Sequence, residues 1–117
     1  MTITAKSDTE ILAIALPMIN EVVKASNEKD WPTFSRYQRT DEAQDPNNKK
    51  HVEQLWENQP LFTSLSLDRE ILGVLRRNNV AEIVWKQTSS QVAGDYLARY
   101  MIEEIDDEIK EIGFVIN

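Results

Sequence analysis

The chain lacks the residues on which several kinds of functional site depend. Its 117 residues include no cysteine and a single histidine. Disulfides, cysteine-ligated zinc, iron–sulfur clusters, thiol catalysis and multi-histidine metal sites are therefore excluded. The three glycines leave no loop of the kind that binds a dinucleotide or a phosphate. The sequence accordingly predicts neither a cofactor nor a metal centre.

Positive charge is also scarce. Lysine and arginine number 13 against 20 acidic residues, so the net charge is −7. Nucleic acid requires a clustered basic face, so it is not expected as a partner. No apolar run approaches the ~20 residues that span a bilayer, and residues 1–8 lack the pattern of a secretory signal. We expect one cytoplasmic domain over residues 1–117, without membrane contact.

Helical periodicity dominates the first half of the chain. Residues 8–27 repeat apolar side chains at every third or fourth position, and Ser7 and Glu10 have the spacing of a capping box. Pro17 predicts a bend within this helix. A short second helix is expected after Asp30, which is a favourable N-cap. Residues 41–50 are polar and predict a loop, and a third helix is expected from about residue 48 to the residues before Pro60.

After Pro60 the pattern becomes that of strands. Four segments are rich in β-branched and aromatic residues, at 67–77, 80–88, 95–105 and 108–116. Asn78-Asn79 and Asp106-Asp107 are suited to two-residue hairpin turns. Residues 89–94 form a longer connection between the two predicted hairpins. The overall expectation is an α+β fold.

The two turns predict a register for each hairpin, and the register assigns side chains to faces. The first hairpin pairs Arg77 with Val80, Val74 with Ile83 and Leu72 with Trp85. The second pairs Glu103 with Lys110, Met101 with Ile112, Arg99 with Phe114 and Leu97 with Ile116. This register places Arg99, Met101 and Phe114 on the face toward the helices.

The reverse face of the second hairpin is also largely apolar. Its apolar residues include Tyr96, Tyr100, Ile102 and Val115. An antiparallel sheet with one solvated face normally alternates apolar and polar residues. A large apolar patch marks a partner surface, so the pattern predicts a homodimer through this outer face. The alternative is that these side chains are simply exposed one by one, between Glu104 and Glu111.

The order of elements resembles the nuclear transport factor 2-like superfamily, also called SnoaL-like, within the cystatin-like group. Lys29-Asp30-Trp31-Pro32-Thr33-Phe34-Ser35-Arg36-Tyr37 is similar to the family's second helix, and Glu111-Ile112-Gly113-Phe114-Val115-Ile116 is similar to its closing strand. The resemblance implies helices packed in the concave face of a curved antiparallel sheet, an apolar cone-shaped cavity and homodimers. It implies no particular activity. Polar residues 41–50 depart from the strand or hairpin that family enzymes carry there.

Several residues are candidates for a ligand site in such a cone. Arg99 on an apolar face could anchor an anionic group. It could instead form a structural ion pair with an acid of the first or third predicted helix, or lie outside if the register is wrong by one residue. Tyr37 could donate to a carbonyl. The walls of the site would come from aromatic and apolar side chains, namely Trp31, Phe34, Trp56, Trp85, Met101 and Phe114. The alternative is that each of these side chains only packs in the hydrophobic core.

The predicted function is therefore the binding of a small, largely apolar ligand with an anionic or carbonyl group. One alternative is a non-catalytic dimerisation or protein-interaction module with a filled core. Another is a cofactor-free isomerase or lyase of the SnoaL type, in which Tyr37 acts with an acid. His51 is expected at the surface, and the acidic end of the last hairpin is expected to be a solvated turn.

Overall fold

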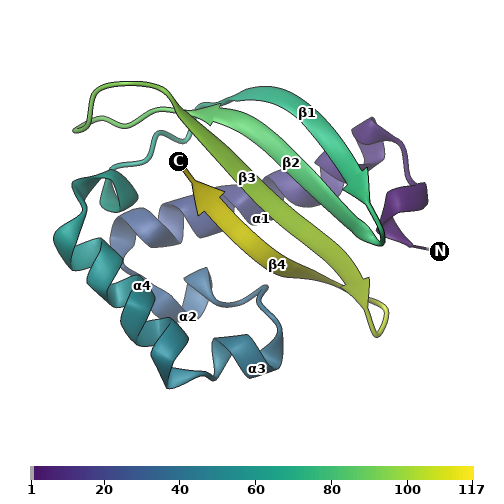
Figure 1. Cartoon of the computed structure of the whole chain (residues 1–117), viewed down its shortest axis with the longest axis horizontal. Helices are drawn as coiled ribbons and strands as arrows, with labels where there is room; N and C mark the ends of the chain where they lie inside the picture. Colours follow the sequence, from purple (N-terminus) through teal and green to yellow (C-terminus); the bar gives the residue numbers. More distant parts are fainter. Residues whose placement is uncertain (1) are drawn as a thin grey trace.

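The computed structural model describes residues 2–117 and has an α+β architecture, with the helices preceding a four-stranded antiparallel sheet in the order β1-β2-β3-β4 (Figure 1). The α+β class expected from the sequence is confirmed. The helices are α1 (Asp8–Glu28), α2 (Trp31–Phe34), α3 (Thr40–Ala43) and α4 (Pro46–Asn58). The strands are β1 (Glu70–Arg77), β2 (Val80–Gln87), β3 (Tyr96–Ile105) and β4 (Glu108–Ile116). Short 3-10 helices occupy Ile3–Ala5 and Pro60–Thr63.

The first helix begins at the predicted capping box. The Glu10 N–H donates to the Ser7 hydroxyl at 3.2 Å, and the Ser7 N–H donates to the Glu10 carboxylate at 3.0 Å. The helix continues across Pro17 to Glu28. It ends at Lys29, which takes a left-handed conformation with φ 56°, a common way to terminate a helix.

The loop predicted over residues 41–50 is wrong in its extent, because helix occupies most of it. α3 forms one helical turn, and α4 begins at Pro46 rather than at residue 48. Asp45 is the N-cap of α4, and its side chain accepts the Asn47 N–H at 2.9 Å. An aspartate followed by proline is a helix-start signal as well as a turn signal.

Both hairpin turns fall where the sequence predicts them. Asn78 has φ 56°, and Asp106 and Asp107 have φ 52° and 65°. Three predicted cross-strand pairs are confirmed: Arg77 with Val80, Val74 with Ile83, and Glu103 with Lys110.

A β-bulge in each hairpin makes the rest of the predicted register wrong. Trp85 lies opposite Ile71, not Leu72, because the register shifts between Ile71 and Gly73. In the second hairpin, Met101 lies opposite Gly113 and Tyr100 opposite Phe114. The extra residue inverts the alternation of side chains beyond the bulge.

The faces of β3 are the reverse of those expected, and the bulge, whose extra residue is Ile112 of β4, brings Phe114 and Ile116 to the same face as Tyr100 and Ala98. Tyr100 and Ile102 are fully buried against the helices, so the prediction that they form an outer surface is wrong. Tyr96 is half-buried at the start of β3, and its hydroxyl donates to the Ala93 carbonyl at 3.2 Å. Val115 lies opposite Arg99, on the face away from the helices.

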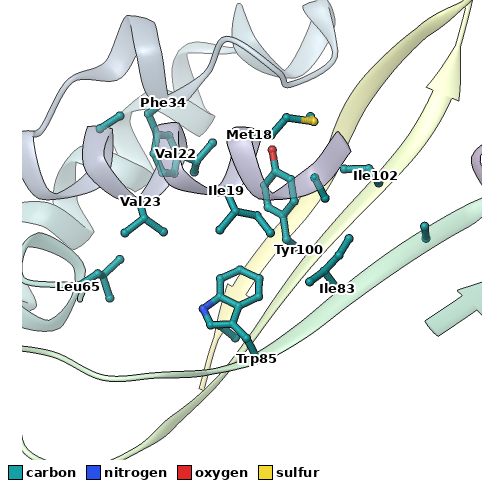
Figure 2. Close-up of a cluster of buried hydrophobic side chains, with 14 of the residues drawn as sticks. Met18, Ile19, Val22, Val23, Phe34, Leu65, Ile83, Trp85, Tyr100 and Ile102 are labelled. Atoms are coloured by element: carbon teal, nitrogen blue, oxygen red, sulfur yellow. The ribbon is translucent and has the colours of Figure 1, made fainter. Parts of the chain in front are cut away.

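The core lies between α1 and the inward face of the sheet. Ile19, Val22 and Val23 of α1 face Trp85 and Tyr100 of the sheet (Figure 2). All five side chains are at most 1% exposed. A closed apolar layer of this kind supplies most of the driving force for folding. Within residues 2–117, no helix is long and apolar enough to cross a membrane.

Candidate functional site

A pocket of about 240 Å³ lies beside α4, between the α2 region and strand β4. Its walls are mostly apolar and include four aromatic rings. The apolar lining consists of Phe34, Val52, Leu55, Trp56, Phe62, Ile112, Gly113, Phe114 and Ile116. The polar lining consists of Ser26, Gln38, Glu42, Asn48, His51 and Glu111. Apolar walls with a few polar groups are typical of small-molecule sites.

Trp56 ties α4 to the base of the pocket. Its indole N–H donates to the Ser26 hydroxyl at 3.0 Å, and that hydroxyl donates onward to the Phe62 carbonyl. The Trp56 ring meets Phe34 edge to face at 5.4 Å between centroids. The indole N–H and the ring of Trp56 are each held by one of these contacts, so this wall is preorganised.

The polar rim is built where the segment after α2 meets the edge of the sheet. The Glu111 N–H donates to the Tyr37 carbonyl at 2.7 Å, and Gln38 pairs with Glu111 as an isolated β-bridge. The Asn48 amide donates to the Gln38 side chain at 2.9 Å and to the Glu42 carbonyl at 2.9 Å. α3 and α4 are thus joined to β4 through a chain of amides.

Glu111 is the unusual residue of this site. Its side chain lies on the inward face of β4, opposite Ile102, and the residue is only 4% exposed. Its Oε1 atom is buried and has no hydrogen-bond partner among the described residues. Burial raises the pKa of Glu111 to about 7, the Tyr100 hydroxyl opposes that rise, and the Glu42 charge adds to it. A buried carboxyl that titrates near neutrality is a candidate functional group.

Tyr100 places a second polar group, its hydroxyl, beside Glu111 in the core. Burial raises its pKa, and the nearby Glu111 charge raises it further. Its hydroxyl is buried and lacks a hydrogen-bond partner in the part of the chain that the structure describes. Tyr100 therefore remains protonated, and its O–H is a donor adjacent to Glu111.

Three of the predicted aromatic residues line the pocket: Phe34, Trp56 and Phe114. Three others lie near it without forming its wall. Trp31 packs beside Phe34 at 6.0 Å between centroids. Trp85 is fully buried, and its indole N–H donates to Gln87 at 2.9 Å. The Tyr37 hydroxyl donates to Glu21. This hydrogen bond, then burial and the Glu21 charge, raise the pKa of Tyr37.

The prediction that Arg99 and Met101 face the cavity is wrong. Both lie on the outer face of the sheet, next to Val80 and Glu82. The Arg99 Nε atom is 3.4 Å from the Glu82 carboxylate. The alternative that a one-residue register error places Arg99 outside is the one observed, and its ion-pair partner belongs to β2 rather than to a helix. Any anion-binding role of Arg99 inside the cone is excluded by this position.

Sequence reasoning missed Glu111, Gln38 and Asn48 as site residues. For Glu111, the sequence did contain one signal. An isolated glycine within a strand indicates a β-bulge, and a bulge changes the face on which nearby side chains lie. Gly113 lies at the bulge of the second hairpin, and Gly73 lies at that of the first. Gln38 and Asn48 carried no local signal, since only the packing of α3 and α4 brings them to the rim.

His51 is exposed at the mouth of the pocket, as expected for a surface histidine. Over residues 2–117 no three histidine or acidic side chains gather as a metal site would require. Comparison with protein-family models, with curated proteins and with solved structures gives no match.

Proposed function

We propose that the protein binds a small, largely apolar molecule in the pocket between α4 and β4. The single observation that carries this proposal is a buried carboxyl group, Glu111, on the wall of an otherwise mostly apolar pocket, with the Tyr100 hydroxyl as its polar neighbour. Buried polar groups in folded proteins nearly always have partners. A ligand that presents one polar group to Glu111 supplies a further polar partner and fills the apolar space.

The pocket volume limits the size of this ligand. About 240 Å³ lies just below the ~300–1,000 Å³ typical of ligand pockets. An aromatic ring with a short substituent is therefore the appropriate scale. The anionic group that the sequence reading allowed is disfavoured, because Arg99 lies on the opposite face and Glu111 would repel an anion.

The three tryptophans provide an internal test of this proposal. Trp56 lines the pocket, whereas Trp85 is buried behind it and Trp31 lies outside its wall. In two-dimensional NMR spectra, small aromatic fragments should shift the Trp56 indole N–H signal and leave the other two in place. A Val52→Trp variant, which fills the pocket, should abolish that shift. Shifts of equal size at all three indoles would contradict the proposal.

A second candidate function, an interaction module, is favoured by the outer face of the sheet. Leu72, Leu75 and Leu97 are 55%, 50% and 41% exposed there. Large apolar side chains exposed on one face are candidates for a protein-binding surface. We therefore retain the proposal of a homodimer through the outer face, now with these leucines and Val115 in place of Tyr96, Tyr100 and Ile102. We also propose that the protein is cytoplasmic, as expected from the sequence. Cell fractionation tests this location.

A further inference from the structure

Acidic side chains outnumber basic ones among the described residues that line the pocket. Glu111 and Glu42 contribute carboxyl groups, and His51 is the only basic group. Of the described residues that line the pocket, none is a lysine or an arginine. The whole chain carries a net charge of −7, which adds to the local field. The pocket is therefore suited to attract a cation and to reject an anion.

The walls are suited to a cation as well. Phe34, Trp56, Phe62 and Phe114 contribute four aromatic rings. Aromatic faces attract ammonium groups electrostatically, and the attraction is largest where water is excluded. The same rings bury the apolar part of a ligand. An acid at one end of an aromatic pocket combines the two contacts that an amine requires.

We propose that the ligand of this pocket is a small arylalkylamine whose ammonium group pairs with the Glu111 carboxylate while its ring packs between Trp56 and Phe114. This inference rests on the proposed function and specifies its ligand class. Glu111 lines the pocket, and its carboxylate accepts the ammonium hydrogen bond. Charge-assisted bonds of this kind are about twice as strong as neutral ones.

The competing ligand chemistry is a neutral carbonyl that accepts a hydrogen bond from protonated Glu111. The two chemistries have opposite pH dependence. The groups that face Glu111 are Tyr100 from β3, Glu42 from α3 and His51 from α4. Burial sets the pKa of Glu111 at about 7, so below that pH an amine must first displace the proton from the carboxyl group. Amine affinity therefore rises with pH through this range, whereas carbonyl affinity falls.

The test uses three probes with the same ring and different charge: phenethylamine, phenethyl alcohol and phenylacetate. Titrations of the full chain are followed at the Trp56 indole N–H. We expect phenethylamine to bind at least about tenfold more tightly than the alcohol at about pH 8, and to lose about tenfold by about pH 5. Phenylacetate should bind most weakly of the three.

Glu111→Gln keeps the shape of the side chain and removes its charge. In this variant phenethylamine should fall to the affinity of the alcohol, while the affinity of the alcohol stays unchanged. Glu53→Gln is the matched control, because Glu53 is exposed on α4 and is not among the described residues that line the pocket, and it should change amine affinity by less than about threefold.

The outcomes separate the inference from the proposed function. Equal affinities for phenethylamine and phenethyl alcohol in the unmodified chain would overturn the amine inference alone, since the pocket would still bind. Amine affinity that is unaffected by pH or by Glu111→Gln would overturn it as well. If no probe shifts Trp56, both the inference and the proposed function fail.

Discussion

The backbone N–H of Glu111 donates to the carbonyl of Tyr37 across 2.7 Å. This contact joins the edge strand of the sheet to the segment after α2. It places Gln38 beside Glu111 and so positions the rim of the pocket. It also covers part of the β4 edge, which would otherwise present unpaired backbone groups to solvent.

Ionisation of Glu111 should make the stability of the protein depend on pH. Its pKa rises from 4.5 to about 7 on folding, so its stabilising effect is complete below about pH 4.5 and is lost as pH rises through 7. The shift corresponds to a loss on the order of 3 kcal/mol. Glu111→Gln should show a flatter profile and exceed the unmodified chain in stability at about pH 8. Urea unfolding at several pH values measures this, and an unchanged pH slope would refute it.

The exposed leucines of the outer sheet face should control self-association. Leu75→Glu and Leu97→Glu should each convert a homodimer into a monomer with little change in the unfolding free energy, because both side chains are solvent-exposed. Sedimentation equilibrium measures the mass. Leu67→Glu is the matched control, because Leu67 is 54% exposed but precedes β1. A monomeric unmodified chain at micromolar concentration would contradict the proposed dimer.

A substitution in the turn between β3 and β4 should increase the stability of the protein. Asp106 and Asp107 both have positive φ, which residues other than glycine adopt at a cost of roughly 1 kcal/mol each. Asp107→Gly creates the aspartate–glycine pair preferred in this turn and should stabilise the protein by about 0.5–1 kcal/mol. Thermal unfolding measures the change. Asp107→Ala is the comparison variant and should not stabilise.

Asn27 should contribute more to stability than its place on α1 indicates. Its amide donates to the Leu65 carbonyl at 2.8 Å, and its oxygen accepts the Leu65 N–H at 2.7 Å. Leu65 is buried, so Asn27→Ala leaves two backbone groups without partners and should cost about 2–4 kcal/mol. Lys24→Ala, at an exposed position of the same helix, should cost less than about 1 kcal/mol. Equal losses in urea unfolding would contradict this role.

Much of the fold follows from local signals in the chain. The capping box of Ser7 and Glu10, the N-cap at Asp30 and the two hairpin turns act through neighbours in sequence. The structure places each of them at the predicted residue. The error over residues 41–50 was also local, because Asp45-Pro46 begins a helix as readily as it forms a turn.

The faces of the sheet could not be assigned in the same way. Both faces of the second hairpin are rich in apolar residues, so alternation did not identify the buried one. The bulge beside Gly113 then moved Phe114 and Ile116 to the face that holds Tyr100 and Ala98. A single extra residue in β4 thus changed the face of the β4 side chains beyond it, since side-chain direction in a strand has a period of two, while β3 alternates without interruption.

By itself, the sequence determined the class of the fold, the positions of most helices and strands, and the turns between them, because these depend on short-range capping, periodicity and backbone conformation. It also excluded thiol and multi-histidine chemistry through composition alone. Only the tertiary structure decided which side chains line the pocket. Glu111, Gln38 and Asn48 meet there through contacts between distant segments, and burial, not residue type, moves the pKa of Glu111 toward neutrality.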